Sequence, residues 1–162
     1  MKLFQGLLGK SGGIAVAAPV SGRLVPIREV NDPTFGEEVL GKGVAIIPSD
    51  NRICSPIDGT VTTVFPTGHA AAVTGHDGTE VLIHVGLDTV KLKGQHFSIH
   101  AENGQKVSRG DLLIEADMEA IRGEGYDIIT PVVICNSEDY SEFRIESPGD
   151  VAQGDVVMTL KK

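Results

Sequence analysis

From Ile14 onward the chain alternates short apolar runs with Gly, Pro, Asp and Asn. Such runs, bounded by turn-forming residues at roughly ten-residue spacing, are typical of an all-β sandwich or barrel. Helical periodicity is weak and predicts only short helices at Phe35–Leu40 and Met118–Arg122. The strands that we predict are Ile14–Ala17, Arg23–Ile27, Gly43–Ile47, Gly59–Phe65, Ala70–Thr74, Val81–Val85, Phe97–Ala101, Leu112–Ala116, Ile128–Cys135, Phe143–Glu146 and Val156–Leu160.

Two segments of the chain are repeated. Ala18–Leu24 recurs 37 positions later as Ser55–Val61, with Pro, a β-branched residue and Gly at matching places. Glu102–Leu113 recurs 44 positions later as Glu146–Val157, where a Gly-Asp turn precedes an apolar strand in both copies. Coincidence among turn-rich strands is the alternative, but two repeats predict a duplicated β scaffold.

The first thirteen residues differ from the rest. Apolar residues at helical spacing between two lysines precede a Ser-Gly-Gly joint, which predicts a flexible or amphipathic leader at residues 1–13 and one domain at residues 14–162. The leader could touch a membrane or a partner, or pack on its own domain. No signal peptide pattern and no membrane-length apolar run occurs, so we expect a soluble, cytoplasmic protein whose other membrane contacts are indirect.

Charge and cysteine content exclude two classes of function. The formal net charge of −8 argues against nucleic-acid binding through an extended basic face. Cys54 and Cys135 form no CxxC or Cys/His metal pattern, so we expect two reduced thiols and no structural zinc site of that type.

The histidines are the main candidates for chemistry. The five are His69, His76, His84, His96 and His100. His84 interrupts the apolar run Val81–Leu87, and strand alternation places it on the outer face beside Leu82 if Val81 and Ile83 face the core. There its imidazole would be a neutral nucleophile near pH 7, or a structural residue. Gly86, two residues after His84, would let another backbone approach closely. We expect the other three histidines, His76, His96 and His100, to be surface residues.

His69 follows a turn and precedes an apolar strand. The Thr67 hydroxyl, two residues away, could hold one of its ring nitrogens. The strands Ala70–Thr74 and Val81–Val85 flank a Gly-His-Asp-Gly turn, and pairing them as a hairpin sets His69 opposite about position 85, next to His84. Two adjacent imidazoles suit phosphoryl transfer. They also suit zinc, although two ligands alone do not make a site.

The chain lacks the motifs that handle nucleotide phosphates or acyl groups. Neither a Walker-type Gly-Lys-Ser/Thr loop nor a Gly-x-Ser-x-Gly elbow is present. Any phosphate must therefore come from, and pass to, other molecules.

At Gly78–Val90 the chain resembles the phosphorylation-site signature of a known family. This family is the glucose-type IIA component of the bacterial phosphoenolpyruvate-dependent sugar phosphotransferase system. The resemblance extends in order over residues 14 to 162, and the other segments that carry it are Ala18–Gly22, Asp32–Phe35, Thr67–Ala70, Lys91–Phe97 and Thr130–Val133.

The resemblance implies an antiparallel β-sandwich built from duplicated motifs, and a phosphotransferase activity. His84 would accept a phosphoryl group from phosphohistidine on the carrier protein HPr. It would then pass the group to a cysteine on the IIB domain of a sugar permease of the glucose or N-acetylglucosamine class. His69 would stabilise the phosphorylated state, and Thr67 would orient His69.

The resemblance also implies a docking surface around His84. Asp32 and Asp88 would be its acidic contacts to HPr. Its apolar ring would consist of Phe35, Val39, Leu40, Phe65, Leu82 and Val90. The chain departs from the family pattern at Ala70–Ala72 and Thr34, which leaves the sugar specificity open. We expect no resident metal or cofactor, and zinc at His69 and His84 only with a ligand from a partner.

Two other functions remain as alternatives. Lysostaphin-type zinc peptidases have a related duplicated β architecture but use a His-x-His pair, whereas this chain has His84-Val85-Gly86. A regulatory module would bind transporters or metabolic enzymes according to its phosphorylation state.

Overall fold

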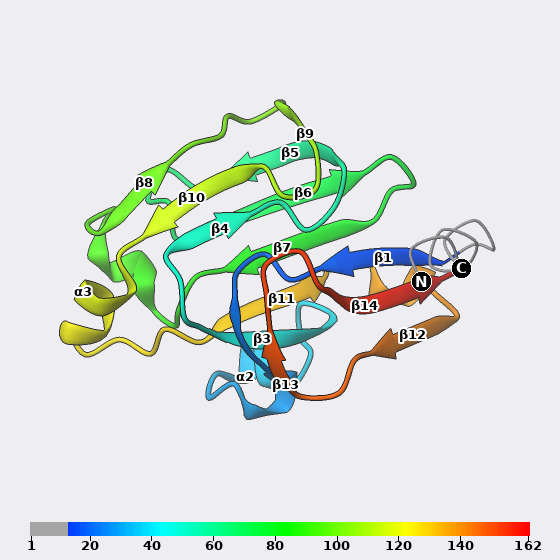
Figure 1. Ribbon diagram of the computed structural model, residues 1–162, viewed down its shortest axis with the longest axis horizontal. Helices are drawn as coiled ribbons and strands as arrows, with labels where there is room; N and C mark the ends of the chain where they lie inside the picture. Colours follow the sequence, from blue (N-terminus) through cyan, green and yellow to red (C-terminus); the bar gives the residue numbers. More distant parts are fainter. Residues whose placement is uncertain (1–12) are drawn as a thin grey trace.

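The structure, a computed structural model shown in Figure 1, describes residues 13–162. The strands are β1 (Ile14–Ala17), β2 (Gly22–Pro26), β3 (Lys42–Pro48), β4 (Arg52–Cys54), β5 (Gly59–Val64), β6 (Ala70–Gly75), β7 (Glu80–His84), β8 (Phe97–Ile99), β9 (Lys106–Val107), β10 (Leu112–Ala116), β11 (Thr130–Ile134), β12 (Glu142–Ile145), β13 (Gly149–Val151) and β14 (Val156–Lys161). The helical elements are the α-helices α2 (Pro33–Gly36) and α3 (Met118–Gly123) and the 3-10 helices η1 (Ile27–Glu29), η2 (Thr89–Leu92) and η3 (Ser137–Asp139).

The strands of the described residues form three sheets, in which every strand pair is antiparallel. The largest has the order β13-β2-β3-β11-β7-β6-β5-β9, and the smaller two have the orders β1-β14-β12 and β4-β10-β8. This arrangement confirms the predicted all-β antiparallel sandwich with only short helical turns.

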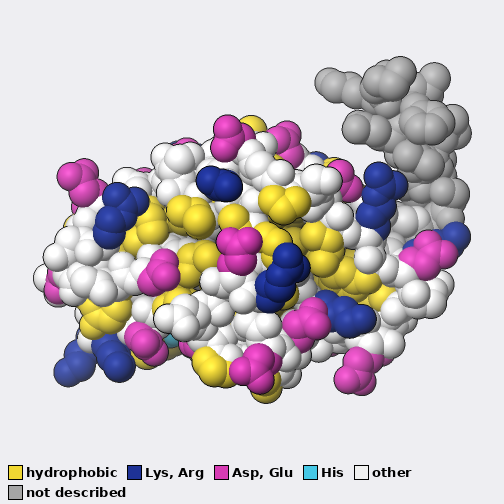
Figure 2. Space-filling view, turned by 90° about the horizontal axis from the view of Figure 1, so that it is seen from below, with side chains coloured by type: hydrophobic (Ala, Val, Ile, Leu, Met, Phe, Trp, Pro, Cys, Tyr) yellow, Lys and Arg dark blue, Asp and Glu magenta, His cyan; other side chains and the backbone are white. Residues whose placement is uncertain are grey.

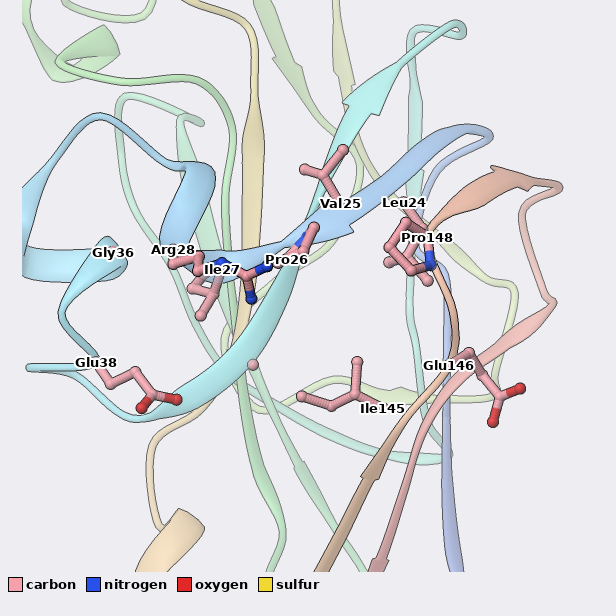
Figure 3. A pocket seen from close by; sticks show the side chains of 11 residues that line it. Leu24, Val25, Pro26, Ile27, Arg28, Gly36, Glu38, Ile145, Glu146 and Pro148 are labelled. Atoms are coloured by element: carbon pink, nitrogen blue, oxygen red, sulfur yellow. The ribbon is translucent and has the colours of Figure 1, made fainter.

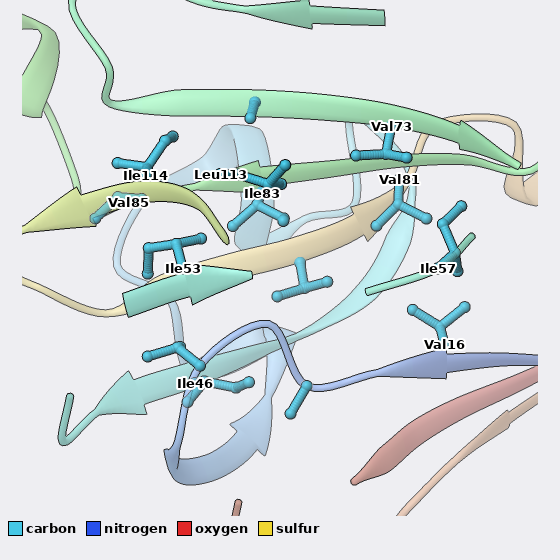
Figure 4. Close-up of a cluster of buried hydrophobic side chains, with 14 of the residues drawn as sticks. Val16, Ile46, Ile53, Ile57, Val73, Val81, Ile83, Val85, Leu113 and Ile114 are labelled. Atoms are coloured by element: carbon cyan, nitrogen blue, oxygen red, sulfur yellow. The ribbon is translucent and has the colours of Figure 1, made fainter. Parts of the chain in front are cut away.

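The core lies between these sheets. Figure 4 shows side chains from β1, β3, β4, β7 and β10 that point into one shared space. The largest fully buried ones there include Ile46, Ile53, Ile83 and Ile114. Burying each such side chain stabilises the fold by about 1.5–3 kcal/mol. Because side chains alternate along a strand, this inward set leaves the intervening residues of β7 on the outer face.

The predicted duplication is visible in backbone hydrogen bonds between the two copies. The Ala17 N–H donates to the Pro56 carbonyl at 3.0 Å, and the Cys54 N–H donates to the Pro19 carbonyl at 2.8 Å. Both donors and both acceptors are 37 positions apart. The two copies of the first repeat therefore contact each other with approximate twofold symmetry.

The second repeat obeys the same symmetry. The Gly110 N–H donates to the Ser55 carbonyl at 2.9 Å, and the Gly154 N–H donates to the Ala18 carbonyl at 3.0 Å. Each copy of the Gly-Asp turn thus binds a copy of the first repeat at the matching position. The sequence repeats correspond to two structural halves that close on one another.

The first predicted helix has different bounds. We expect it at Phe35–Leu40, but α2 begins at Pro33 and ends at Gly36. The Asp32 side chain accepts a hydrogen bond from the Thr34 N–H at 3.0 Å, and proline suits the first helical position. Glu38, with φ of 59°, takes the left-handed conformation and prevents continuation.

Three short strands are absent from our prediction, namely β4, β9 and β13. They contain two or three residues each and pair with partners distant in sequence, so hydrophobic alternation within them carries little signal. The predicted strand Ile128–Cys135 was also too long, because pairing begins at Thr130.

The predicted leader lies outside the described residues, apart from Gly13. Within residues 13–162, no helix is long and apolar enough to cross a membrane.

Candidate functional site

A hairpin brings two histidines together on the outer face of the large sheet. β6 and β7 pair with Ala70 opposite His84, and the Val85 N–H donates to the His69 carbonyl at 2.7 Å. The ring centroids of His69 and His84 are 5.1 Å apart, with the ring planes at 78°. The prediction that pairing sets His69 opposite position 85, beside His84, is confirmed.

The outward direction of His84 follows from the pattern of β7. Val81, Ile83 and Val85 are fully buried, whereas Leu82 and His84 between them are partly exposed. Burial of the three β-branched side chains therefore fixes the strand's register and forces the imidazole to the other side.

The Gly86 carbonyl orients the ring of His84. His84 Nδ1 lies 2.7 Å from this oxygen, which can only accept a hydrogen bond. Nδ1 therefore carries the proton, and Nε2 is left with a free lone pair. The expected close approach of another backbone at Gly86 is confirmed, but that backbone belongs to this chain: a Cβ there would lie 2.7 Å from Thr89 Cγ2 and 2.8 Å from the Asp127 carbonyl oxygen, which leaves no room for a partner's backbone.

Thr67 holds the ring of His69, as predicted. Its Oγ1 lies 2.5 Å from His69 Nδ1. When the hydroxyl donates, it places the ring hydrogen on Nε2, where it can be offered to a third group. The turn that carries Thr67 includes Gly68, with φ of +72°, and packs so closely on β8 that a Cβ would lie 2.9 Å from Phe97 Cβ.

Aromatic side chains support both imidazoles. The ring centroid of Phe35 lies 4.9 Å from that of His84, and the centroid of Phe65 lies 5.2 Å from that of His69. These contacts exclude water from one side of each histidine, which disfavours the charged form of an imidazole.

Burial accordingly lowers the pKa of both histidines. It lowers the pKa of His69 to about 4, with a smaller contribution from repulsion by charged His84. Burial also lowers the pKa of His84, and the hydrogen bond to Gly86 and the charges of Asp32 and Asp88 partly oppose this. Both imidazoles are therefore neutral near pH 7, the state that an attacking nitrogen requires.

Most residues of the predicted docking surface are exposed. The exposed hydrophobic ones are Val39, Leu40, Phe65 and Val90. Asp88 is also exposed, and the Asp32 carboxylate caps α2. Phe35 does not fit a docking role because it is only 4% exposed and packs behind His84. Leu82 is partly buried against the small cluster that includes Phe35. Phe35 therefore supports the ring of His84, whereas a docking role for the partly exposed Leu82 stays a prediction.

The other three histidines lie away from the pair. His76 is exposed in the turn at the opposite end of the hairpin. His96 contacts Glu124, and His100 Nε2 lies 2.8 Å from the Glu115 carboxylate. These positions agree with the surface role that we expect for them.

His84 is partly exposed at the surface, and His69 is buried beside it. A hollow of about 420 Å³ lies beside β2 and α2, and its lining includes Arg28, Glu38 and Ile145 (Figure 3). Neither this hollow nor a second one near His96 is lined by His69 or His84. On the lower face of the molecule, hydrophobic patches alternate with both acidic and basic side chains (Figure 2). A partly exposed nucleophile outside these two hollows suits a macromolecular donor better than a small enclosed substrate.

The donor set for a metal is small. Within residues 13–162, no group of three or more His, Cys, Asp or Glu side chains is placed to hold a metal ion. Cys54 is buried, Cys135 is exposed, and both are free thiols.

The fold is similar to that of a solved IIA protein. The structure superposes on the glucose permease IIA from Mycoplasma capricolum with a TM-score of 0.87 and 37% sequence identity. The match covers 92% of this chain and 96% of that one. The fold thus defines the class as that of IIA components of sugar permeases.

The sequence identifies the family. Residues 14–140 match the family described as phosphoenolpyruvate-dependent sugar phosphotransferase system, EIIA 1. The chain is 43% identical to the glucose-specific EIIA component of Buchnera aphidicola over 146 residues, which are 90% of each protein. It is 39% identical to the glucose-specific EIIA component of Haemophilus influenzae over 99% of this chain and 97% of that one. The chain belongs to this EIIA 1 family.

Other relatives are much longer proteins. The chain is 43% identical over 145 residues to the beta-glucoside-specific EIIBCA component of Bacillus subtilis. It spans 20–24% of the length of this and two further beta-glucoside-specific EIIBCA components. The family match does not favour the zinc-peptidase and regulatory-module alternatives.

Proposed function

We propose that Nε2 of His84 accepts a phosphoryl group from phosphohistidine on HPr and passes it to the cysteine of a IIB domain. The observation that carries this proposal is the bond between His84 Nδ1 and the Gly86 carbonyl, which leaves Nε2 free on a partly exposed side chain. The neutral state of the ring near pH 7 and the neighbouring imidazole of His69 support it.

The transfer needs no metal and no proton shuttle. The lone pair on His84 Nε2 attacks phosphorus, and the electrons of the breaking N–P bond return to the donor's imidazole. The phosphorylated ring keeps its Nδ1 proton and carries positive charge. The Gly86 carbonyl and the negative charges of Asp32 and Asp88, which raise the pKa of His84, stabilise that charge.

His69 is placed to stabilise the phosphoryl group itself. With the Thr67 hydroxyl donating to Nδ1, the hydrogen on His69 Nε2 is available to a phosphoryl oxygen. This bond is absent before transfer, so it favours the phosphorylated state and the transition state selectively.

The surface around the pair suits brief docking. Val39 and Val90 are 70% and 50% exposed, and Asp32 and Asp88 lie close enough to affect the charge of His84. Apolar contact gives affinity, while acidic side chains attract a basic carrier face and discriminate among partners. The relatives named EIIBCA support a IIB domain as the second partner.

The sugar, the location and the metal are further parts of the proposal. Because the relatives include glucose-specific and beta-glucoside-specific components, IIB domains of both permease classes should be tested as acceptors. Transfer to a permease places the chain on the cytoplasmic side of the membrane. Zinc at His69 and His84 would need a partner's ligand, because two ligands fall short of a tetrahedral site.

The test is phosphorylation in a purified system. Phosphoenolpyruvate, enzyme I and HPr should label the protein with acid-labile, base-stable phosphate, and His84→Gln should abolish the label. His69→Gln should still accept phosphate but pass it more slowly to IIB domains from several permeases. His76→Gln is the matched control and should behave as wild type, because His76 is exposed at the far end of the hairpin. Wild-type labelling of His84→Gln would refute the proposal.

A further inference from the structure

The segment that follows His84 is tied back onto the hairpin by a buried threonine. We propose that Thr89 is a positioning residue that holds the Gly86 carbonyl against His84 and thereby fixes which ring nitrogen carries the proton. The consequence for phosphoryl transfer rests on the proposed function of His84. The effect on the tautomer of the unphosphorylated ring does not.

The hydroxyl of Thr89 is linked through Val85 to the backbone of His69. Thr89 is fully buried, and its Oγ1 donates to the Val85 carbonyl at 2.5 Å. The N–H of Val85 donates in turn to the His69 carbonyl at 2.7 Å. Val85, the residue after His84, is thus held through both its N–H and its carbonyl, and Thr89 binds the carbonyl.

The methyl group of Thr89 fixes the position of Gly86. A Cβ on Gly86 would lie 2.7 Å from Thr89 Cγ2 and 2.8 Å from the Asp127 carbonyl oxygen, so the glycine is packed between them. The same Asp127 carbonyl accepts a hydrogen bond from the Leu87 N–H at 2.9 Å. With φ of +76°, Gly86 occupies a conformation that its neighbours must maintain.

These contacts determine where the Gly86 carbonyl points. Because this oxygen lies 2.7 Å from His84 Nδ1, its position selects the tautomer with the proton on Nδ1. Without the Thr89 hydroxyl, the turn loses one restraint and the bond to Nδ1 weakens. The proton then spends more time on Nε2, where it blocks the lone pair that attacks phosphorus.

Nitrogen NMR of the unphosphorylated protein is the direct test, because the 15N shifts of His84 distinguish its two tautomers. Thr89→Val keeps the shape of the side chain and removes the hydroxyl. We expect it to raise the ratio of the Nε2–H to the Nδ1–H form roughly three- to tenfold, the effect of one hydrogen bond. Thr89→Ser should restore the wild-type ratio. Labelling by phospho-HPr should slow by a similar factor in Thr89→Val and recover in Thr89→Ser.

Thr79→Val is the matched control. Thr79 is also fully buried and lies just before the opposite end of β7, where its hydroxyl bonds to Tyr140 Oη at 2.7 Å and to Asp77 Oδ1 at 2.8 Å. It should lose stability and keep the wild-type tautomer ratio. If Thr89→Val does not fold, Thr89→Ala compared with Thr89→Ser tests the same hydroxyl.

Wild-type tautomers in the variants without the hydroxyl, or no recovery with serine, would overturn the role of Thr89. Wild-type protein that accepts no phosphate would overturn the proposed function alone, since the NMR comparison needs no phosphate.

Discussion

Acid should destabilise the protein through His69. Burial, with a smaller effect from charged His84, lowers the pKa of His69 from 6.5 to about 4. Between these two values the unfolded chain binds a proton at His69 that the folded chain does not, so the free energy of unfolding falls as the pH falls. The stability that comes from neutral His69 is complete above about pH 6.5 and is lost progressively toward about pH 4.

The size of this effect follows from the shift in pKa. The difference between 6.5 and about 4 is about 2.5 units. At 1.36 kcal/mol per unit, the full loss is about 3 kcal/mol. Because the side chain is only 5% exposed, solvent screens little of the penalty for charging it.

Urea unfolding of wild type and His69→Gln, from about pH 7 down to about pH 4.5, isolates this contribution. Gln cannot titrate, whereas the carboxylates titrate in both proteins and cancel in the difference. Wild type should lose about 2.5 kcal/mol more than His69→Gln over this interval. Parallel curves for the two proteins would refute the neutral, buried state of His69.

Two further predictions concern the turn after His84 and the docking surface. Gly86→Ala should lower the free energy of unfolding in urea by about 2–4 kcal/mol, because φ is +76° and a backbone oxygen lies 2.8 Å from the added carbon. Gly78→Ala is the control and should lower it by only about 1–2 kcal/mol, because φ is +91° but no atom lies within 4 Å of the added carbon. Equal losses in the two variants would contradict this reasoning. Val90→Ser should raise the KM for phospho-HPr roughly fivefold in labelling assays and leave the stability unchanged. Ile145→Ser is the control, at a residue of similar exposure that lines the hollow in Figure 3, and it should leave the KM unchanged. Equal effects of the two substitutions would exclude a specific docking surface around His84.

Local patterns were sufficient to predict most of the fold. Alternation along Val81–Val85 predicted which side of β7 faces the core, and the repeated Pro-x-x-Gly turns predicted the duplication. The short strands β4, β9 and β13 could not be predicted, because tertiary partners, and not their own composition, hold them in place. The end of α2 depends on a left-handed Glu38, a conformation that few non-glycine residues adopt.

The part of the site that depends on hairpin geometry, the contact between the two histidines, was predictable from the sequence. Pairing about the Gly-His-Asp-Gly turn brought His69 to His84, and the two-residue spacing brought Thr67 to His69. The roles of the Gly86 carbonyl and of Thr89 depend on backbone direction in a non-repetitive segment, which side-chain pattern does not encode. A glycine two residues after the outward histidine was the available signal.

The position of the phosphoryl group tests the role of His84 most directly. Phosphorus and nitrogen NMR of the protein, labelled with 15N and phosphorylated by phosphoenolpyruvate, enzyme I and HPr, would locate the N–P bond. The free lone pair on Nε2 and the engaged Nδ1 predict phosphorus bonded to His84 Nε2, with Nδ1 still protonated. Phosphorus on Nδ1 of His84, or on any other side chain, would contradict this assignment.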